Sequence, residues 1–285
     1  MRLFCFGCGY TAEALLRRLA PRAMTCAGTK RSLPEAIPSL PGLTLIAYAG
    51  DQASSEVKRA LKDTSHILVS IPPDLEGDAV LRHYRHDLAE LPQLVWIGYL
   101  SSVGVYGDCH GAWVDETSPT RPSSERSLRR FEAEQAWLAF GQEVDRRVEI
   151  FRLAGIYGPQ RSVLDNLRGG SARRIIKSGQ IFNRIHVDDI ARTLAAAIDT
   201  DTGYRIYNVS DDEPAAPQDV VAYAAELLGL AAPPEVPFEQ AEMTGMAASF
   251  WSESRRVRNN RIRHELGVQL LYPTFREGLR SLLTA

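Results

Sequence analysis

Residues 2–16 read RLFCFGCGYTAEALL, which is a short apolar run, a turn with two glycines and the start of a helix. The first glycine, Gly7, permits a tight turn, and Gly9 lets the backbone approach a pyrophosphate. Ala12 is small enough for the helix to pack closely on the strand, with its positive N-terminus facing the phosphates. Glycine turns also occur without a ligand, but this position between strand and helix favours a dinucleotide-binding βαβ unit.

The composition is that of an ordinary globular protein. The chain has 285 residues, of which 45% are apolar and 24% are charged, enough for a buried core in one large domain or one and a half. The formal net charge of -2 gives no electrostatic reason to expect nucleic acid or an anionic membrane as a partner. No apolar run approaches the roughly 20 residues that a membrane-spanning helix needs.

The cysteines and the N-terminus bear on the cellular compartment. The four cysteines are too few for a disulfide framework in a chain of this length; they are Cys5, Cys8, Cys26 and Cys109. Cys5 and Cys8 form a C-x-x-C pair without a second ligand pair, so we expect neither a metal site nor a redox motif. The N-terminus lacks the long apolar segment of a signal peptide, and we therefore expect a cytoplasmic protein.

Strand-like and helix-like segments alternate along most of the chain, which predicts an α/β fold with a doubly wound parallel sheet. The predicted strands are 2–6, 23–28, 43–48, 66–71, 94–100, 148–153 and 204–208. The predicted helices are 11–19, 54–63, 78–91, 124–141 and 188–199. Beyond Ser210 prolines interrupt short helical segments, and this change indicates a smaller C-terminal lobe.

Five segments follow one another in a characteristic order. They are residues 7–12 (GCGYTA), 101–107 (SSVGVYG), 152–159 (RLAGIYGP), 186–191 (HVDDIA) and 207–210 (YNVS). Together they resemble the extended short-chain dehydrogenase/reductase family, also called the NAD-dependent epimerase/dehydratase family. The resemblance implies a Rossmann-type nucleotide-binding domain and a substrate-binding lobe. The expected boundaries are 1–154 with 184–209 for the domain, and 155–183 with 210–285 for the lobe.

The family's signature Tyr-x-x-x-Lys is missing from this chain. In the family a glutamate usually lies four residues beyond the lysine, and anchoring on Glu134 puts Arg130 at the lysine position and Arg126 at the tyrosine position. Arg130 can still hold a ribose hydroxyl and supply positive charge. Because a guanidinium stays protonated near neutral pH, Arg126 cannot replace a phenol in proton transfer. The chain looks closest to atypical members of the superfamily, including the bacterial group related to the protein YeeZ.

The segment after the second predicted strand bears on the choice of dinucleotide. An NAD-specific unit carries an acid there that binds the ribose 2′-hydroxyl, whereas this chain reads Thr29-Lys30-Arg31-Ser32. Arginine pairs with a phosphate through two hydrogen bonds, and hydroxyls donate to it as well. The segment therefore favours NADP over NAD. A solvated basic turn that binds nothing is the alternative.

The resemblance implies further contacts with the dinucleotide. Asp51 follows the third strand, where the family often contacts the adenine, and Ile71 and Pro72 follow the fourth strand, on the nicotinamide side. The predicted cofactor-binding residues are Gly7, Gly9, Tyr10, Thr11, Ala12, Thr29, Lys30, Arg31, Ser32, Asp51, Ile71, Pro72, Gly155 and Ile156.

Three residues are candidates for the chemistry: Ser102, Tyr106 and Arg130. Ser102 falls where the family's serine binds the substrate oxygen, although a serine at a strand end also satisfies backbone groups. Tyr106 is the nearest phenol after it, and we hypothesise that Arg126 or Arg130 lowers its pKa so that it replaces the missing acid.

The segments expected to frame the substrate pocket are rich in basic groups. The predicted substrate-binding residues are Arg126, Tyr157, Arg161, Arg184 and His186, and they suit a small anionic or sugar-like molecule. For Tyr157 a packed ring, for Arg161 a surface charge and for His186 a structural hydrogen bond are the alternatives. The basic run 255–263 lacks interleaved aromatic residues, so we expect a solvated or substrate-facing segment rather than a nucleic-acid site.

Two functions from different classes follow. The first is an NAD(P)-dependent oxidoreductase or nucleotide-sugar epimerase/dehydratase with an unusual proton donor. The second is a dinucleotide-binding sensor that kept the fold and lost the chemistry, since one fold hosts many activities. The sequence is compatible with a monomer or a homodimer.

Overall fold

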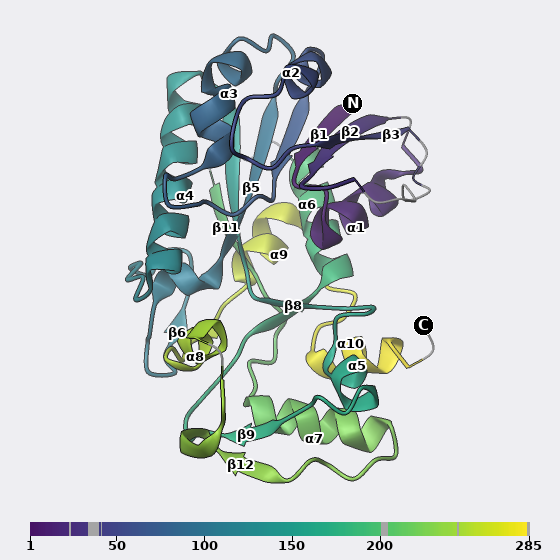
Figure 1. Ribbon diagram of the computed structural model, residues 1–285, viewed down its shortest axis with the longest axis vertical. Coiled ribbons are helices and arrows are strands. Elements are labelled where there is room, and N and C mark those ends of the chain that lie inside the picture. The colour runs from purple at the N-terminus through teal and green to yellow at the C-terminus, as the bar shows by residue number, and fades with distance from the viewer. Residues whose placement is uncertain (23, 34–39, 41, 201–204, 244, 284–285) are drawn as a thin grey trace.

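A computed structural model describes residues 1–285 except 23, 34–39, 41, 201–204, 244 and 284–285 (Figure 1). Its centre is a sheet of seven parallel strands in the order β11-β7-β5-β4-β1-β2-β3. The strands are β1 (Arg2–Phe6), β2 (Thr25–Lys30), β3 (Leu43–Ala47), β4 (His66–Val69), β5 (Trp96–Ser102), β7 (Arg147–Leu153) and β11 (Arg205–Val209). All seven correspond to predicted strands; positions 23 and 204 of those predictions lie outside the described residues.

Helices cover both faces of this sheet, which confirms the doubly wound, Rossmann-type architecture. The hydrophobic core on one face includes residues of α1 (Tyr10–Leu19), α6 (Val187–Asp199) and α9 (Asn260–Leu266). The core on the other face includes residues of α2 (Ser55–Leu61), α3 (Ala79–Ala89) and α4 (Glu125–Glu143). The five predicted helices are thus present, with ends shifted by a few residues.

Strand β1 shows why the sheet is buried on both sides. Leu3 and Cys5 belong to the core shared with α1 and α6, while Phe4 and Phe6 belong to the core shared with α3 and α4. Side chains alternate between the two faces of a strand, so an uninterrupted apolar run suits a strand with helices on both faces.

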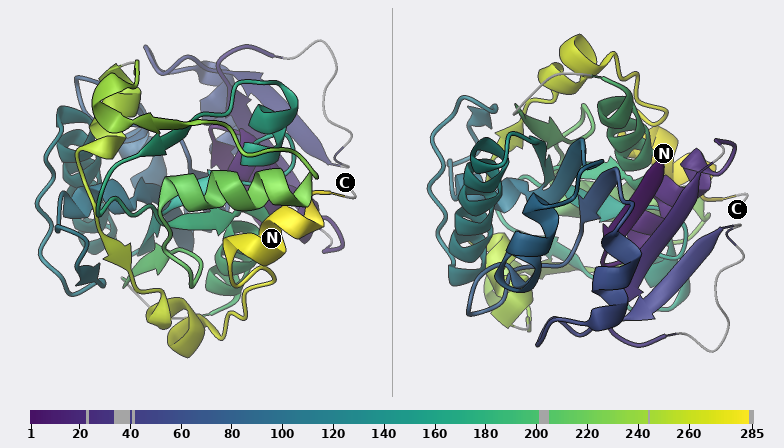
Figure 2. Two further views of the ribbon diagram at one scale, coloured as in Figure 1. Left: turned by 90° about the horizontal axis from the view of Figure 1, so that it is seen from below. Right: turned by 90° about the horizontal axis from the view of Figure 1, so that it is seen from above.

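A lobe of short elements lies below the carboxyl edge of the sheet in Figure 1. Its parallel strand pairs are β8 (Gly155–Tyr157) with β10 (Arg184–His186) and β9 (Arg174–Ile176) with β12 (Glu235–Pro237). Its helices are α5 (Val163–Arg168), α7 (Pro217–Leu227), α8 (Gly245–Trp251) and α10 (Phe275–Ser281), with a 3-10 turn η2 (Phe238–Gln240). Seen from below, α7 and α10 lie side by side (Figure 2).

Two elements connect the C-terminal part of the chain to the sheet domain. Helix α9 packs in the core beside α6, and β13 (Arg256–Val257) pairs with β6 (Trp113–Val114). The division into a domain and a lobe at the predicted boundaries stays a prediction. Among the helices of the described residues, none has the length and apolar character needed to cross a membrane.

Candidate active site

A cavity of about 1080 Å³ lies between the sheet and the lobe, at the carboxyl ends of β4, β5 and β7. In open α/β sheets ligands bind at this edge, where neighbouring strands lead to helices on opposite faces. Predicted site residues in the cavity lining are Thr11, Pro72, Ser102, Arg126, Arg130, Gly155, Ile156, Tyr157, Arg161 and Arg184.

The glycine turn joins β1 to α1 as predicted. Gly7 has a φ of +87°, and a β-carbon there would lie 3.1 Å from the side chain of Ile71, so both its conformation and its packing require glycine. Gly9 is different: it begins α1 with a φ of -104°, and a β-carbon there would meet no atom within 4 Å. No backbone angle and no contact within the described part of the chain requires glycine at position 9, and its role in binding a dinucleotide stays a prediction.

The residues around the turn hold it in place. The backbone N–H of Gly7 donates to the hydroxyl of Thr29 over 2.9 Å, and Ala12 is fully buried against the sheet. The phenol of Tyr10 donates to the carbonyl of Pro159 over 2.9 Å and so links the turn to the lobe. Thr29 therefore shapes the turn rather than facing a 2′-phosphate.

The basic segment after β2 keeps one exposed cation. Lys30 pairs with Glu13 of α1 over 2.7 Å, so its charge is matched within the protein. Arg31 and Ser32 are exposed at the end of the segment. Asp51 is exposed as well, and its carboxylate accepts the N–H of Gln52 over 3.0 Å.

Ser102 ends β5 and caps the 3-10 turn η1 (Val103–Tyr106). Its oxygen accepts the N–H of Gly104 over 3.1 Å, while its hydroxyl proton has no acceptor in the described part of the chain. Ser102 is half-buried and lines the cavity. Its hydroxyl is therefore available to donate to an oxygen of a bound molecule.

A buried ion pair fixes α4 beneath the cavity. Arg152 of β7 donates to Glu134 of α4 over 2.7 Å, and their side chains are 3% and 0% exposed. The hydroxyl of Ser101 also donates to Glu134. The carboxylate therefore holds α4 against β5 and β7, and this explains why a charged residue is buried there.

Arg130 and Arg126 lie one and two turns before Glu134 on α4, and both line the cavity. Arg130 donates to the carbonyl of Leu100 over 2.9 Å and to the hydroxyl of Tyr99 over 3.1 Å. Arg126 is exposed, and its guanidinium lies over the ring of Phe250 from the lobe, 4.5 Å from the ring centre. The structure thus brings the two arginines to the same wall as Ser102.

Tyr106 lies elsewhere. Its ring is fully buried, and its hydroxyl donates to the side chain of Asn208 over 2.8 Å, outside the cavity lining. Burial raises the pKa of its phenol, opposed in part by Arg152, which lies over the ring. The hypothesis that Arg126 or Arg130 lowers this pKa is wrong, because burial raises the pKa and the arginine that acts on the phenol is Arg152 of β7.

Tyr157 and His186 lie side by side on β8 and β10. Tyr157 lines the cavity, but its ring packs in the core of the lobe, where a β-carbon on Gly278 would lie 1.9 Å from its hydroxyl. His186 caps α6, its Nδ1 accepts the N–H of Asp188 over 3.2 Å, and burial lowers its pKa. These contacts are structural, and His186 lies outside the cavity lining.

Two further predicted arginines reach the cavity from the lobe. The guanidinium of Arg161 lies 5.6 Å from the ring centre of Tyr10, next to the glycine turn. Arg184 donates to the carbonyl of Phe182 over 3.1 Å, and burial lowers its pKa. Both arginines are thus at the cavity, as their predicted role requires.

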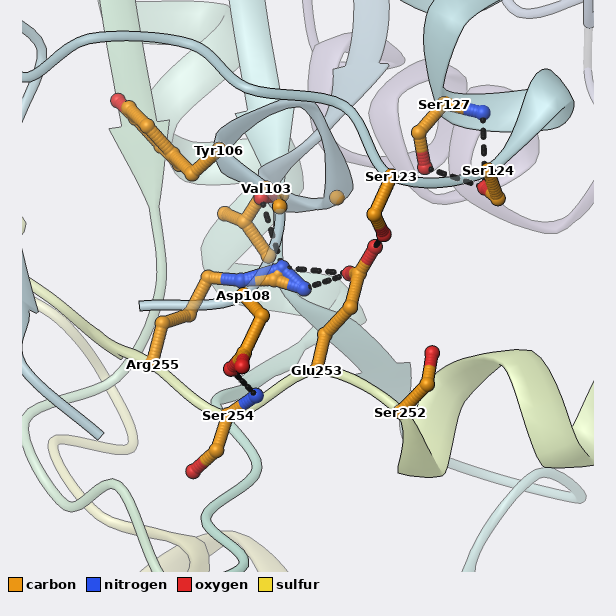
Figure 3. Close-up of polar contacts among 12 residues, drawn as sticks. Val103, Tyr106, Asp108, Ser123, Ser124, Ser127, Ser252, Glu253, Ser254 and Arg255 are labelled. Carbon is orange, nitrogen blue, oxygen red and sulfur yellow. Dashed lines mark hydrogen bonds and ion pairs between the residues drawn. The ribbon is translucent and has the colours of Figure 1, made fainter. Parts of the chain in front are cut away.

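The sequence interpretation missed the part of the wall drawn in Figure 3. Glu253 lies between Arg255, which donates to it over 2.9 Å, and Ser123, whose hydroxyl also donates to it. Both charged side chains are buried and line the cavity, so of the two alternatives for Arg255 the solvated one is wrong and the substrate-facing one stays a prediction. Further cavity residues that were not predicted are Ser124, Ser127, Gln160, Asn183, Phe250 and Trp251. The serines at 123, 124 and 127 around the start of α4 were the available signal.

The fold and parts of the sequence match known proteins. Residues 94–210 match the model of the NAD dependent epimerase/dehydratase family. The chain is 46% identical to a functionally unknown conserved protein from Silicibacter pomeroyi DSS, with a TM-score of 0.88 and coverage of 99% of this chain and 98% of that one. No similar sequence is found among curated proteins.

Two more distant structures share the fold. UDP-glucuronic acid 4-epimerase from Bacillus cereus, solved in complex with NAD, is 16% identical with a TM-score of 0.81, over 100% of this chain and 96% of that one. MoeE5, solved with UDP-glucuronic acid and NAD, is 19% identical with a TM-score of 0.79, and the match covers 99% of this chain and 97% of that one. The glycine turn, the doubly wound sheet and the segment that matches the model of the NAD dependent epimerase/dehydratase family therefore occur together on this chain.

Proposed function

We propose that this protein binds NADP or NAD at the glycine turn and catalyses a reaction of the nucleotide-sugar epimerase, dehydratase or reductase type in the cavity. One observation carries the proposal: Gly9 leaves open space at the start of α1, next to a cavity lined by Thr11 and Ser102. Known structures with this fold hold NAD and nucleotide sugars in related proteins, which supports the same ligand classes here.

In this proposal the first turn of α1, Ser102 and Arg130 each have a separate role. The first turn of α1 would hold the pyrophosphate, and the bound nicotinamide supplies hydride transfer. Ser102 donates a hydrogen bond to the substrate oxygen. Arg130, held by Leu100 and Tyr99, places a fixed positive charge at the same wall, where it stabilises a developing oxyanion without transferring a proton.

NADP is the dinucleotide that the segment after β2 favours. Arg31 is exposed and free of any ion pair in the described residues, with the hydroxyl of Ser32 beside it, whereas Lys30 is paired with Glu13. We expect Arg31→Gln to weaken NADPH binding about 10-fold and to leave NADH binding unchanged, since a charge-assisted contact to the 2′-phosphate is lost. An equal effect on both dinucleotides would show that Arg31 does not contact the 2′-phosphate.

The substrate proposal rests on the arginines of the cavity. Arg161 and Arg184 reach it from the lobe and Arg126 from α4, and such a lining suits a small anionic or sugar-like molecule. Tyr157 contributes its ring to the wall, and His186 acts by fixing α6 and β10.

A second candidate function has its own support. Tyr157 is the phenol of the cavity lining, and its hydroxyl lies against Gly278, while the hydroxyl of Tyr106 is bonded to Asn208. Neither phenol is therefore placed to exchange a proton with a substrate. A sensor that binds a dinucleotide and catalyses no reaction needs no such phenol. Hydride exchange distinguishes the two functions: only the enzyme transfers deuteride from labelled NADPH to the carbonyl carbon of a bound keto-sugar, whose oxygen takes a proton from water as NADPH is oxidised to NADP.

The binding proposal has a test that leaves the fold intact. A side chain at position 9 has room within the protein but would occupy the path of the pyrophosphate. We therefore expect Gly9→Val to keep the wild-type free energy of unfolding and to lose NADPH binding, which NADPH fluorescence measures. The control is Gly245→Ala, another glycine with open space around it, which should bind like the wild type. Normal binding by Gly9→Val would overturn the proposed site.

A further inference from the structure

The lining of the cavity has more arginines than carboxylates, whereas the chain as a whole has a slightly negative net charge. Five arginines line it, namely Arg126, Arg130, Arg161, Arg184 and Arg255, against two carboxylates, Asp165 and Glu253. The whole chain has a formal net charge of -2. The excess of cations is therefore local to the cavity.

Both carboxylates of the lining are engaged with other groups. Glu253 is held by Arg255 and Ser123, as Figure 3 shows. Asp165 accepts the N–H of Ser162 over 2.9 Å and its hydroxyl over 2.7 Å, in the capping box of α5. Neither carboxylate neutralises the arginines of α4.

Arg126 is the arginine with the freest donors. Its guanidinium face lies on the ring of Phe250, and no carboxylate of the described residues pairs with it. Stacking uses the face of the planar group and leaves the N–H donors at its edge available for a bidentate contact. Arg130, one turn further along, has only neutral acceptors, the hydroxyl of Tyr99 and the carbonyl of Leu100.

Hydroxyl groups lie next to these cations. A β-carbon on Gly104 would lie 3.1 Å from the oxygen of Ser127 and 3.3 Å from that of Ser102, so the two hydroxyls flank the same point of the wall. Ser127 lies next to Arg126 in α4 and lines the cavity. Guanidinium edges with neighbouring hydroxyls are the donor set that binds carboxylates and phosphates.

We infer that Arg126, stacked on Phe250 at the cavity that Ser127 also lines, binds an oxyanion of the substrate, a carboxylate or a phosphate at the end that faces α4. The inference rests on the proposed function, because it places the substrate in the cavity of a dinucleotide-bound protein. Phe250 is a positioning residue: it comes from the lobe and orients the guanidinium while leaving its edge free.

Matched ligands test this charge preference in the NADPH complex. UDP-glucuronic acid against UDP-glucose tests a carboxylate, and glucose 6-phosphate against glucose tests a phosphate, each followed by calorimetry or ligand-observed NMR. In one pair we expect the member with the additional carboxylate or phosphate to bind about 10-fold tighter than the member that lacks it. Added salt should reduce the difference, since the arginine is exposed.

Variants separate the arginine from the rest of the wall. Arg126→Gln should abolish the preference for the ligand with the additional anionic group and leave the affinity for its matched partner unchanged. Phe250→Leu should reduce the same preference. The control, Arg129→Gln, changes a neighbouring arginine that pairs with Glu125 and does not line the cavity, so it should keep the preference.

The outcomes are distinct from those for the dinucleotide. Failure of both NADPH and NADH to bind would overturn the proposed function, and the two dinucleotides are titrated first for that reason. If a dinucleotide binds but the two members of each pair bind equally or not at all, or if Arg126→Gln keeps the preference, the oxyanion site is overturned.

Discussion

Arginines on two sides of α4 have opposite surroundings. Arg152 lies in the core, where Glu134 matches its charge and Ser101 completes the network. Arg126 and Arg130 lie on α4 in the two turns before Glu134, where they line the cavity, and neither has a carboxylate partner in the described residues. A buried charge needs its partner for stability, whereas an unpartnered charge in a cavity is available to a ligand.

The largest effect is expected at the buried pair. Glu134→Ala leaves Arg152 buried without its counter-charge, and we expect the free energy of unfolding to fall by about 3–5 kcal/mol. Denaturant unfolding measures the change. The double variant Glu134→Leu with Arg152→Met should recover most of the loss, because it removes both charges and keeps volume. A loss below about 1 kcal/mol in the single variant would show that the pair does not hold α4.

Arg130 should show an intermediate effect on stability. Arg130→Met removes hydrogen bonds to Leu100 and Tyr99, which predicts a loss of about 1–2 kcal/mol in unfolding free energy. Hydride exchange should fall at least about 10-fold, since the fixed charge at the oxyanion is lost. Arg130→Lys keeps the charge and should retain more of the exchange than the methionine variant. Equal exchange in all three proteins would remove Arg130 from the chemistry.

Tyr106 is buried beside Arg152 and lies outside the cavity lining. Tyr106→Phe removes the hydrogen bond to Asn208 and should cost about 1 kcal/mol of stability. Hydride exchange should stay within about 2-fold of the wild type, the scatter expected when no interaction with the transition state changes. A much larger loss of exchange with unchanged stability would return Tyr106 to the role of acid.

The smallest effect on stability is expected at Arg126. The guanidinium is exposed, lies over the ring of Phe250 and has no ion pair among the described residues, so Arg126→Gln should change the free energy of unfolding by no more than about 0.5 kcal/mol. The same variant is expected to lose oxyanion binding. A stability loss as large as that of Arg130→Met would mean that the stacked arginine is structural.

The sequence was most informative where local pattern and structure coincide. The central strands are apolar on both faces, so their runs were recognisable, and the glycine turn carries its own steric requirements at Gly7. Strands of two or three residues, such as β8 and β13, are too short to show a periodic pattern. Tyr106 was misplaced because a 3-10 turn, not distance along the chain, decides where its ring points.

Contacts between distant segments were beyond sequence reasoning. Glu253 meets Ser123 across 130 positions, and its carboxylate also accepts from Arg255, whereas no carboxylate of the described residues pairs with Arg126. The sequence assigned Arg126 to the substrate and Arg255 to a solvated or substrate-facing run, but it did not show which of them has a carboxylate partner. Only the fold separates arginines that serve the structure from those that face the cavity.

A crystal structure with NADP tests the central claim most directly. We expect the pyrophosphate at the Gly7–Ala12 turn, the 2′-phosphate near Arg31 and the nicotinamide in the cavity beside Ser102, with the edge of Arg126 free to meet a substrate. A dinucleotide bound away from the glycine turn, or a cavity that stays empty at saturating NADP and NAD, would contradict the account.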